Sequence, residues 1–399
     1  MITKAELLSL AQEKSLRPDI VEKDYVLGWV LAGISAHPKL TNDWLFKGGT
    51  CLKKCFFETF RFSEDLDFTL TNSNHLDPTF LQSVFSQISE WVYEHSGIEM
   101  PESLQSFEVL TNSRGHLIGQ GKIAYQGPIS PKPLPRIKID LVATEKITST
   151  PIRASVFHPY SDQPQGGIHV LSYAYEEIFA EKVRALIDRT RPRDLYDVVC
   201  LFINSPKLPK PKKLRNQISE KCRFKDISFP PSTGIERQHR EISQSWGPML
   251  GHQLPLLPDP TMFLTELQNF FAWLDGQYQP NQPLSIPSAS EYTLVSDRRL
   301  PSIMPLKLKS SLELFRFAAA NRLCVDLSYR RQTKEVVTER IEPYWLCRNK
   351  MGELSILGVQ CKPSIMTFYS VKNIAEISVT RQHFTPHSRD DRSPMWIEP

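Results

Sequence analysis

The chain has 399 residues, a net charge of 48 − 44 = +4 and a charged fraction of 23%. This composition gives a globular protein room for two or three domains and excludes a strongly acidic or basic disordered chain. Seven cysteines without a Cys-x-x-Cys pair fit neither a disulfide framework nor a zinc finger. The sequence has no run of about 18 apolar residues and no signal-peptide pattern, so we expect a cytoplasmic protein without a membrane partner.

Apolar periodicity in the first hundred residues predicts helices over 3–15, 19–35 and 78–95. The stretch between the last two, residues 47–68, is expected to form a loop, a helix and a strand. The charged residues Glu22, Lys23 and Asp24 leave two interpretations open. They either reach the 47–68 stretch or form a charged first helical turn.

The 47–68 stretch begins with Lys47, Gly48, Gly49 and Thr50. Two glycines let a backbone approach an anion closely, and Thr50 can cap the helix that follows. The free N–H groups of such a helix terminus attract phosphate. This pattern therefore indicates a nucleotide site.

Carboxylates follow in the sequence Ser63-Glu64-Asp65-Leu66-Asp67. Strand alternation places Asp65 and Asp67 on one face, and two such charges are costly unless a hard cation with oxygen ligands lies between them. A predicted strand at 136–143 places Asp140 on the polar face, as a third carboxylate beside the other two. Further strands are expected at 106–111 and 119–126.

A helix is predicted from Tyr175, with a break at Pro192 and a second helix after it. Lys182 lies on an apolar-flanked stripe and needs an anionic partner. Two kinds of partner remain open for Lys182: a triphosphate, or a buried ion pair with Glu181 or Asp197. Asp194 and Asp197 suit the first turn of the second helix, so capping alone could explain them.

These segments together resemble the AbiEii/AbiGii abortive-infection nucleotidyltransferase toxins, within the polymerase-β-like nucleotidyltransferase superfamily. The resemblance covers residues 1 to about 278. It rests on five motifs in the family's order, which are Lys-Gly-Gly-Thr, Ser-Glu-Asp-Leu-Asp, Lys-Ile-Asp, Glu-Lys-Val-Arg-Ala and Arg-Asp-Leu-Tyr-Asp. It implies an α+β fold with a mixed sheet, flanking helices and a helical extension.

The same resemblance implies roles for the motif residues. Two Mg²⁺ ions would be bound by Asp65, Asp67 and Asp140, which with Lys182 form the expected catalytic set. The NTP would be contacted by Lys182 as well and by the other motif positions, which are Lys47, Gly48, Gly49, Thr50, Ser63, Arg193, Asp194 and Asp197. The implied function is that of a toxin of a bacterial toxin–antitoxin or phage-defence system, with an RNA acceptor such as tRNA and a cognate antitoxin.

Residues 205–225 carry a basic run that would suit either an RNA backbone or a solvated linker face. A helix at 261–275 follows. We therefore predict a nucleotidyltransferase domain at 1–278, with its core at about 20–160 and a helical part at about 172–278. A proline-rich linker is predicted at 279–305 and a second domain at 306–390.

The second domain is predicted to hold a helix at about 308–322 and short strands at about 335–348, 353–360, 366–371 and 374–380. It resembles a degenerate WYL domain, a Sm-like β-barrel. The matching residues are 319–322, 327–330, 340–344 and 357–358, whereas Leu354-Ser355-Ile356 departs from the family's Trp-Tyr-Leu. Arginines 330, 331, 340 and 348 form either a basic surface or ordinary strand-edge charges.

Two functions remain open from the sequence. The first is an enzyme, a Mg²⁺-dependent nucleotidyltransferase toxin. The alternative is a nucleic-acid- or ligand-sensing regulator whose N-terminal domain binds a nucleotide but is inactive. The complete set of Asp65, Asp67 and Asp140 favours the enzyme, because a binding module has no need of three converging carboxylates.

Overall fold

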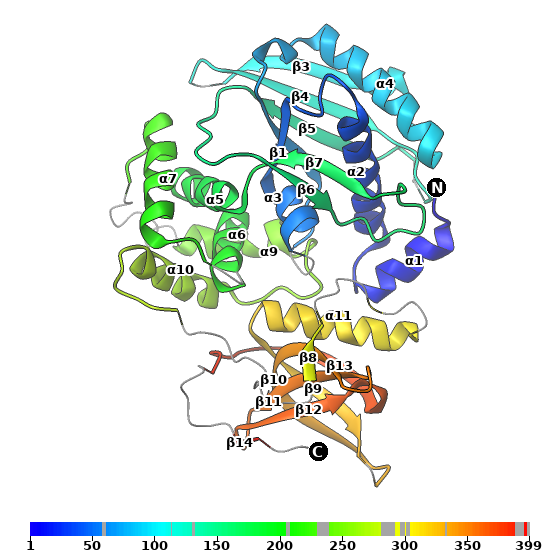
Figure 1. Ribbon diagram of the computed structural model, residues 1–399, viewed down its shortest axis with the longest axis vertical. Coiled ribbons are helices and arrows are strands. Elements are labelled where there is room, and N and C mark those ends of the chain that lie inside the picture. Colours follow the sequence, from blue (N-terminus) through cyan, green and yellow to red (C-terminus); the bar gives the residue numbers. More distant parts are fainter. Residues whose placement is uncertain are drawn as a thin grey trace. The chain divides into compact units, whose positions relative to one another are not determined.

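The computed structural model (Figure 1) describes residues 1–57, 61–112, 114–129, 132–204, 208–229, 239–280, 292–295, 300, 304–331, 333–387 and 395–396. The chain packs into two compact units. The first comprises Met1–Ala11, Leu16–Val198 and Lys207–Ser245, and the second comprises Gln12–Ser15, Val199–Pro206 and Trp246–Pro399. These units are defined by packing, so the domain boundaries at 278 and 305 stay a prediction.

The first unit is built on a mixed sheet in the order β3-β4-β5-β2-β1-β7-β6. Within it, β2 runs antiparallel to β1 and parallel to β5. This arrangement places Asp65 and Asp67 of β2 beside the strand that carries Asp140. The strands are β1 (Trp44–Lys47), β2 (Asp65–Leu70), β3 (Ser106–Thr111), β4 (Leu117–Ala124), β5 (Arg136–Val142), β6 (Ile152–Val156) and β7 (Ile168–Ser172).

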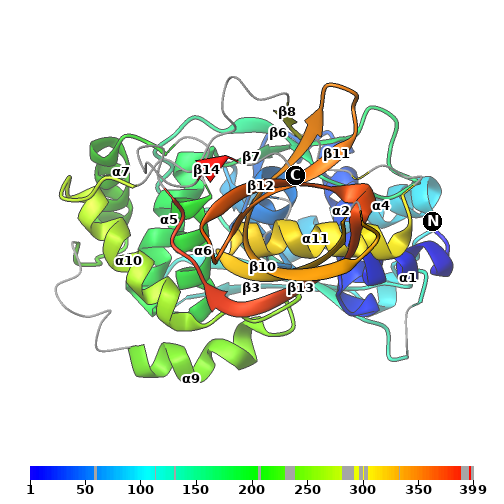
Figure 2. The same cartoon turned by 90° about the horizontal axis from the view of Figure 1, so that it is seen from below.

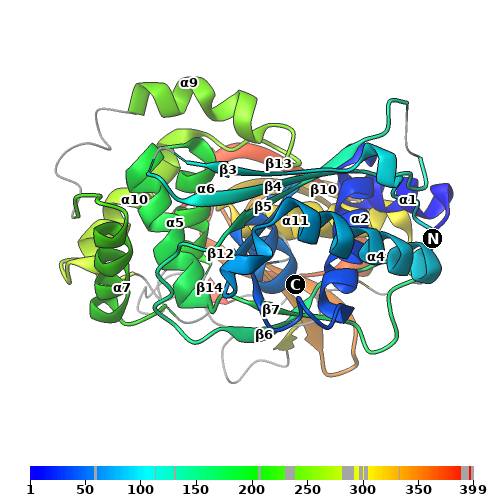
Figure 3. The ribbon, with the colours of Figure 1, turned by 90° about the horizontal axis from the view of Figure 1, so that it is seen from above.

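Two long helices, α2 and α4, cover one side of this sheet (Figure 3). The two helices cross closely, because a methyl group at Gly33 of α2 would come within 2.9 Å of Ile88 on α4. Helix α4 begins at its N-cap Asp77, whose carboxylate accepts the Phe80 N–H at 2.7 Å, and ends at Gly97 with φ +74°. The helices of this part are α1 (Lys4–Glu13), α2 (Pro18–Ala36), α3 (Gly48–Cys51), α4 (Pro78–Ser96), a π-helix (Leu52–Phe56) and 3₁₀ turns (Ser73–His75, Glu102–Leu104).

Helices then dominate the chain from Tyr175 onward. Proline opens most of them, since it has no N–H to leave unpaired in the first turn. Helix α5 packs against α7, and the buried Lys221 of α7 lies 2.6 Å from Glu177 of α5. These helices are α5 (Tyr175–Arg189), α6 (Pro192–Ile203), α7 (Pro211–Phe224), α9 (His239–Leu250) and α10 (Pro260–Leu274).

The second unit carries another sheet, in the order β13-β9-β10-β11-β12-β14, with β8 paired to β10. Helix α11 packs against β9, β10 and β13, and Figure 2 shows the strands curving past it. Arg322, just after α11, donates to Glu266 of α10 at 2.6 Å. The elements are β8 (Tyr292–Leu294), α11 (Leu306–Ala320), β9 (Leu323–Arg330), β10 (Val336–Asn349), β11 (Leu354–Gln360), β12 (Ile365–Ser370), a 3₁₀ turn (Val371–Asn373), β13 (Ile374–His383) and β14 (Met395–Trp396).

The predicted α+β character is confirmed, and most predicted elements lie within two residues of their observed bounds. The strands without a predicted counterpart are β1, β6, β7, β8, β9 and β14, and the helices without one are α7 and α9. Most of the predicted linker, 281–291, 296–299 and 301–303, lies outside the described residues. The antiparallel sheet of the second unit is present, while its identity as a Sm-like barrel stays a prediction. None of the described helices is long and apolar enough to cross a bilayer.

Candidate active site

The glycine loop follows directly from the end of β1. Gly48 has φ +82°, and a methyl group there would lie 2.0 Å from Oδ2 of Asp67. Only glycine therefore fits between the loop and the β2 carboxylate. The next residue, Gly49, is similarly restricted, because its methyl would meet Arg61 at 2.8 Å and Oγ of Ser63 at 3.0 Å. The predicted motif residues at 47–50 and 63 thus lie together.

Two other loop residues are held by the protein itself. The buried hydroxyl of Thr50 donates to the backbone carbonyl of Asp65, which ties the loop to the first residue of β2. Nζ of Lys47 lies 3.7 Å from Glu145, and the Lys47 side chain is 12% exposed. Thr50 therefore acts on the position of the loop, and Lys47 contributes its charge from the edge of the site.

Three aspartates converge on the two strands beside the loop. Asp67 is paired in register with Asp140 across the parallel β2–β5 pair, and Asp65 is paired with Lys138. Leu66, Phe68, Ile139 and Leu141 are buried on the opposite face. Strand alternation thus turns the carboxylates of Asp65, Asp67 and Asp140 to one face, as predicted.

Burial and the crowding of like charge both shift the pKa values of these carboxyl groups. Burial raises the pKa of Asp67 to about 6, against the opposing charges of Lys182 and Lys47, and the neighbouring carboxylates of Asp140 and Asp65 raise it further. Burial and the charge of Asp65 likewise raise the pKa of Asp140, which accepts a hydrogen bond from Gln120 at 3.3 Å. Burial, together with the neighbouring carboxylates, therefore disfavours the fully ionised form of this cluster.

The carboxylates do not form a closed cage. In the described parts of the chain, no three acidic, histidine or cysteine side chains are grouped so that they could hold an ion by themselves. A metal ion at these carboxylates therefore stays a prediction. Mg²⁺ commonly takes one or two protein carboxylates and completes its octahedron with water and substrate phosphates.

A second charged cluster lies behind the carboxylates and is fully paired. Arg61 donates to both oxygens of Asp197, at 2.8 and 2.9 Å, and Lys182 Nζ lies 2.7 Å from Asp197 Oδ2. All three side chains are buried. Burial alone would raise the pKa of Asp197, but the two cations lower it below its ordinary value.

The structure thus supplies one of the partners left open for Lys182, namely Asp197. Its charge also acts on Asp67, so Lys182 lies between the paired cluster and the carboxylates. Asp194 is 4.0 Å from Lys182. It also accepts hydrogen bonds from Nε and Nη2 of Arg189, at 2.7 and 2.9 Å. Asp194 and Asp197 therefore do more than cap α6.

Arg193 is half-buried at the start of α6. Burial and the nearby positive charge of Arg61 lower its pKa, while the carboxylates of Asp65 and Glu64 act in the opposite direction. Arg193 therefore faces the acidic side of the site. Of the charged residues at 22–24, Lys23 reaches this region, because its Nζ lies 2.9 Å from Glu64.

Sequence reasoning missed Arg61 and misjudged part of the basic run. Arg61 stands two residues before Ser63, and an arginine among phenylalanines in the sequence Phe-Arg-Phe was the available signal. In the basic run, residues 211–224 form α7. Lys221 is buried against Glu177, and Lys225 lies 3.3 Å from Glu145, so neither lysine belongs to a solvated linker face or an exposed RNA surface.

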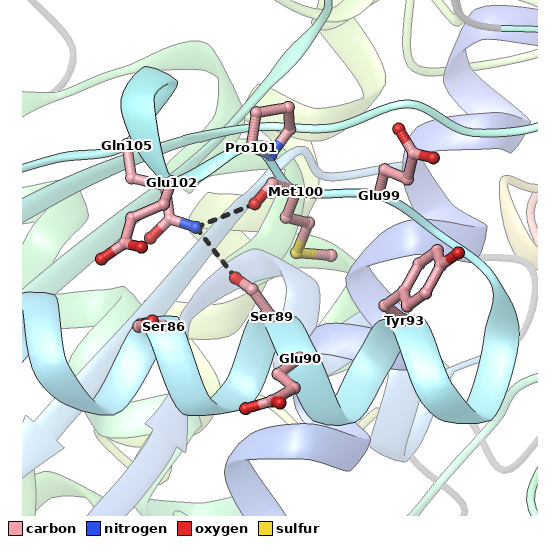
Figure 4. Close-up of a pocket in the computed structure, with 9 residues that line it drawn as sticks. All are labelled: Ser86, Ser89, Glu90, Tyr93, Glu99, Met100, Pro101, Glu102 and Gln105. Carbon is pink, nitrogen blue, oxygen red and sulfur yellow. Dashed lines mark hydrogen bonds between the residues drawn. The ribbon is translucent and has the colours of Figure 1, made fainter.

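A separate hollow of about 450 Å³ lies beside the second half of α4 (Figure 4). The amide of Gln105 bridges Ser89 Oγ at 2.9 Å and the Met100 carbonyl at 3.2 Å on its wall. None of the predicted site residues lines it. The carboxylates are therefore in a different place from this hollow.

The mixed sheet and the converging carboxylates are consistent with a nucleotidyltransferase core. Residues 29–275 match the family described as nucleotidyl transferase AbiEii toxin, Type IV toxin–antitoxin system, which is more than half of the 399 residues. The chain belongs to this family of toxin nucleotidyltransferases, and the resemblance drawn from its motifs is confirmed. No curated protein matches the chain.

Two solved structures share weaker likeness. MenT4, a nucleotidyltransferase toxin from Mycobacterium tuberculosis H37Rv, is 17% identical with a TM-score of 0.46, covering 69% of this chain and 90% of its own. Proteasome accessory factor B/C of Arthrobacter aurescens is 10% identical with a TM-score of 0.22, covering 99% of this chain and 73% of its own.

Proposed function

We propose that the chain transfers NMP from an NTP to an acceptor, an RNA such as tRNA, as the toxin of its toxin–antitoxin system. The observation that carries this proposal is the register of Asp67 with Asp140 beside a glycine loop that leaves no room for a Cβ. Family membership supports the reaction class. The alternative of an inactive regulator has no need of this crowded carboxylate face.

Asp65, Asp67 and Asp140 would hold two Mg²⁺ ions. Their oxygen donors are of the kind Mg²⁺ prefers, and three carboxylates on one face of adjacent strands would be stabilised by a cation. When bound, Mg²⁺ neutralises the phosphates and polarises the α-phosphorus. The glycine backbone at 48–49 lets the phosphates approach closely, and Lys182 adds a positive charge on the same side.

Proton transfer falls to Asp140. By analogy with the family, its carboxylate lies nearest the acceptor hydroxyl and favours the loss of that hydroxyl's proton. The new bond joins that hydroxyl oxygen to the α-phosphorus, and the bond to pyrophosphate breaks. Arg61 does not reach this chemistry directly. Through its two hydrogen bonds to Asp197 it fixes the carboxylate that orients Lys182.

The test is transfer of label from each α-labelled NTP, with Mg²⁺ and total RNA, by the wild type and by Asp65→Ala and Lys182→Ala variants. We expect label in RNA with the wild type only. The matched control is Lys4→Ala, at an exposed lysine of α1, which should retain full transfer. If no NTP gives labelled RNA, or if Asp65→Ala labels equally well, the transferase proposal is wrong.

Two separate experiments test metal dependence and toxicity. Chelation by EDTA should abolish transfer, and added Mg²⁺ should restore it. Expression of the wild type should arrest growth, whereas expression of Asp67→Ala should not. Arrest by both proteins at equal expression would separate toxicity from nucleotidyl transfer.

For the sheet of the second unit we propose a WYL-like regulatory or RNA-positioning role. Two of its arginines already have acidic partners, since Arg340 donates to both oxygens of Asp326 at 2.7 and 2.9 Å and Arg331 lies 3.3 Å from Glu339. Arg330 and Arg348 are the arginines to test. Unchanged activity and acceptor choice in an Arg330→Glu/Arg348→Glu variant would remove this role.

A further inference from the structure

The carboxylates share their face of the sheet with exposed cations. Along β4 and β5 the side chains alternate, and Gly119, Gly121, Ile137, Ile139 and Leu141 are buried. Gln120, Lys122, Arg136 and Lys138 are exposed on the opposite face, which is the face of Asp140. Figure 3 shows α2 and α4 on one side of these strands. The cations thus lie on an open continuation of the carboxylate surface.

The register orders these side chains into a strip. Gln120 lies opposite Asp140, Lys122 opposite Lys138, and Ala124 opposite Arg136. Each step is two residues along the strands, about 7 Å. Starting from Asp140, the strip therefore runs first to the pair of lysines and then to Arg136.

The pairing of Lys122 with Lys138 is unfavourable by itself. Like charges placed directly opposite each other on antiparallel strands destabilise a sheet. Neither lysine, nor Arg136, forms an ion pair with any other described residue. Of the acids on this face, Asp65 of β2 lies opposite Lys138, and Glu108 of β3 lies opposite Gln120, at the Asp140 end. Lys122 and Arg136 lie opposite no acid in the described strands. A ligand with successive negative charges would offset the repulsion.

We propose that Lys122, Lys138 and Arg136 bind consecutive phosphates of a polynucleotide acceptor whose terminal hydroxyl lies at Asp140. This proposal rests on the proposed transferase function and adds the path of the acceptor. An extended polynucleotide presents a phosphate at intervals comparable to the two-residue step of the strip. A free nucleotide or a protein side chain would occupy the Asp140 end alone and would leave the second and third cations unused.

The first test separates acceptor binding from chemistry. In a Lys122→Gln/Lys138→Gln variant we expect the KM for RNA to rise about tenfold or more, with kcat at saturating RNA and the KM for NTP within about twofold of wild type. Lys4→Gln, which removes an exposed lysine of α1, is the matched control and should change nothing. A Lys122→Arg/Lys138→Arg variant should restore the wild-type KM, because it restores the charge.

Salt dependence gives an independent readout. Binding of a fluorescently labelled single-stranded oligoribonucleotide is measured by anisotropy without NTP, at several salt concentrations. Loss of two phosphate contacts should reduce the slope of log K against log salt by about 1.4. This measurement needs no catalysis, so failure of the transferase proposal and failure of the strip can be told apart.

The outcomes divide as follows. RNA binding that depends on the strip, without any transfer, would support the strip and overturn the transferase function. An unchanged RNA KM and salt slope in the double glutamine variant, with transfer intact, would overturn the strip alone. Equal losses in the Lys4→Gln control, or label found only in protein acceptors, would also overturn the strip.

Discussion

Two charged clusters lie within a short distance of the glycine loop, and they are built in opposite ways. In the cluster of Arg61, Asp197 and Lys182 every charge has a partner within 3 Å, and the pKa of Asp197 is lowered. In the cluster of Asp65, Asp67 and Asp140 like charges face one another, and burial raises the pKa of Asp67 to about 6.

The difference separates architecture from ligand binding. A buried charge with full pairing is stable only while both partners are present, so its removal is felt in folding. A cluster left short of positive charge gains from an added cation, so its removal is felt in function and little in folding. The predictions below follow this contrast, from the largest expected effect to the smallest.

The largest effect is expected at Asp67. An Asp67→Asn variant should lose nucleotidyl transfer by about 10³-fold or more, because it removes a ligand of the proposed Mg²⁺ site, which would supply several kcal/mol of transition-state stabilisation. Its free energy of unfolding should stay within about 1 kcal/mol of wild type, since one repelling charge is removed. Urea unfolding and NTP transfer measure the two quantities. A large loss of stability would contradict the contrast.

Arg61 should show the reverse order of effects. In an Arg61→Ala variant Asp197 stays buried with only Lys182 as its cation, and we expect the free energy of unfolding to fall by about 3–5 kcal/mol. An Arg61→Met/Lys182→Met/Asp197→Leu triple variant should be more stable than the single one, because no buried charge of the cluster is left without its partner. Equal losses in both variants would show that packing, rather than charge, determines the cost.

Helix α7 allows the same contrast among lysines of one element. Lys221 is buried, 2.6 Å from Glu177, and donates to the Lys146 carbonyl at 2.8 Å. Lys221→Met should therefore cost about 3 kcal/mol, whereas Lys212→Met at an exposed position should cost under about 0.5 kcal/mol. Thermal or urea unfolding of the two variants checks this, and similar values would refute the buried role of Lys221.

The smallest expected effect is on the pH dependence of the free energy of unfolding in acid. The folded pKa of Asp197 is lower than its unfolded value near 4, so Asp197 stabilises the fold above that value. The contribution is lost as the pH falls from about 4 through the lower folded pKa, at up to about 1.4 kcal/mol per pH unit. An Asp197→Asn variant lacks this contribution and should show a shallower decline below pH 4. Identical pH profiles would contradict it.

The sequence identified the carboxylates because strand alternation is a strong constraint. Once Leu66 and Ile139 are assigned to the buried face, Asp65, Asp67 and Asp140 have only one face left. The positive φ of Gly48 was likewise implied by two successive glycines. What the sequence could not supply was the register of β2 with β5, which depends on a crossover through α4, β3 and β4.

Partners across long separations were harder to predict. Arg61 and Asp197 are 136 residues apart, and no local pattern connects them. Lys182 had three candidate partners, and helical periodicity could not choose between a neighbour on the same helix and a carboxylate on the next. Strands β1, β6 and β7 were missed because each has only four or five residues, too few to show a period.

The contact between Gly48 and Asp67 has a consequence for the genetics of this toxin. A side chain as small as alanine at position 48 would occupy the space of the Asp67 carboxylate, since its Cβ would lie 2.0 Å from Oδ2. In a selection for cells that survive expression of the chain, survivors should therefore recur at codon 48 with any replacement. At codon 247, where a Cβ on the exposed glycine of α9 would meet nothing closer than 3.9 Å, many replacements should leave toxicity in place.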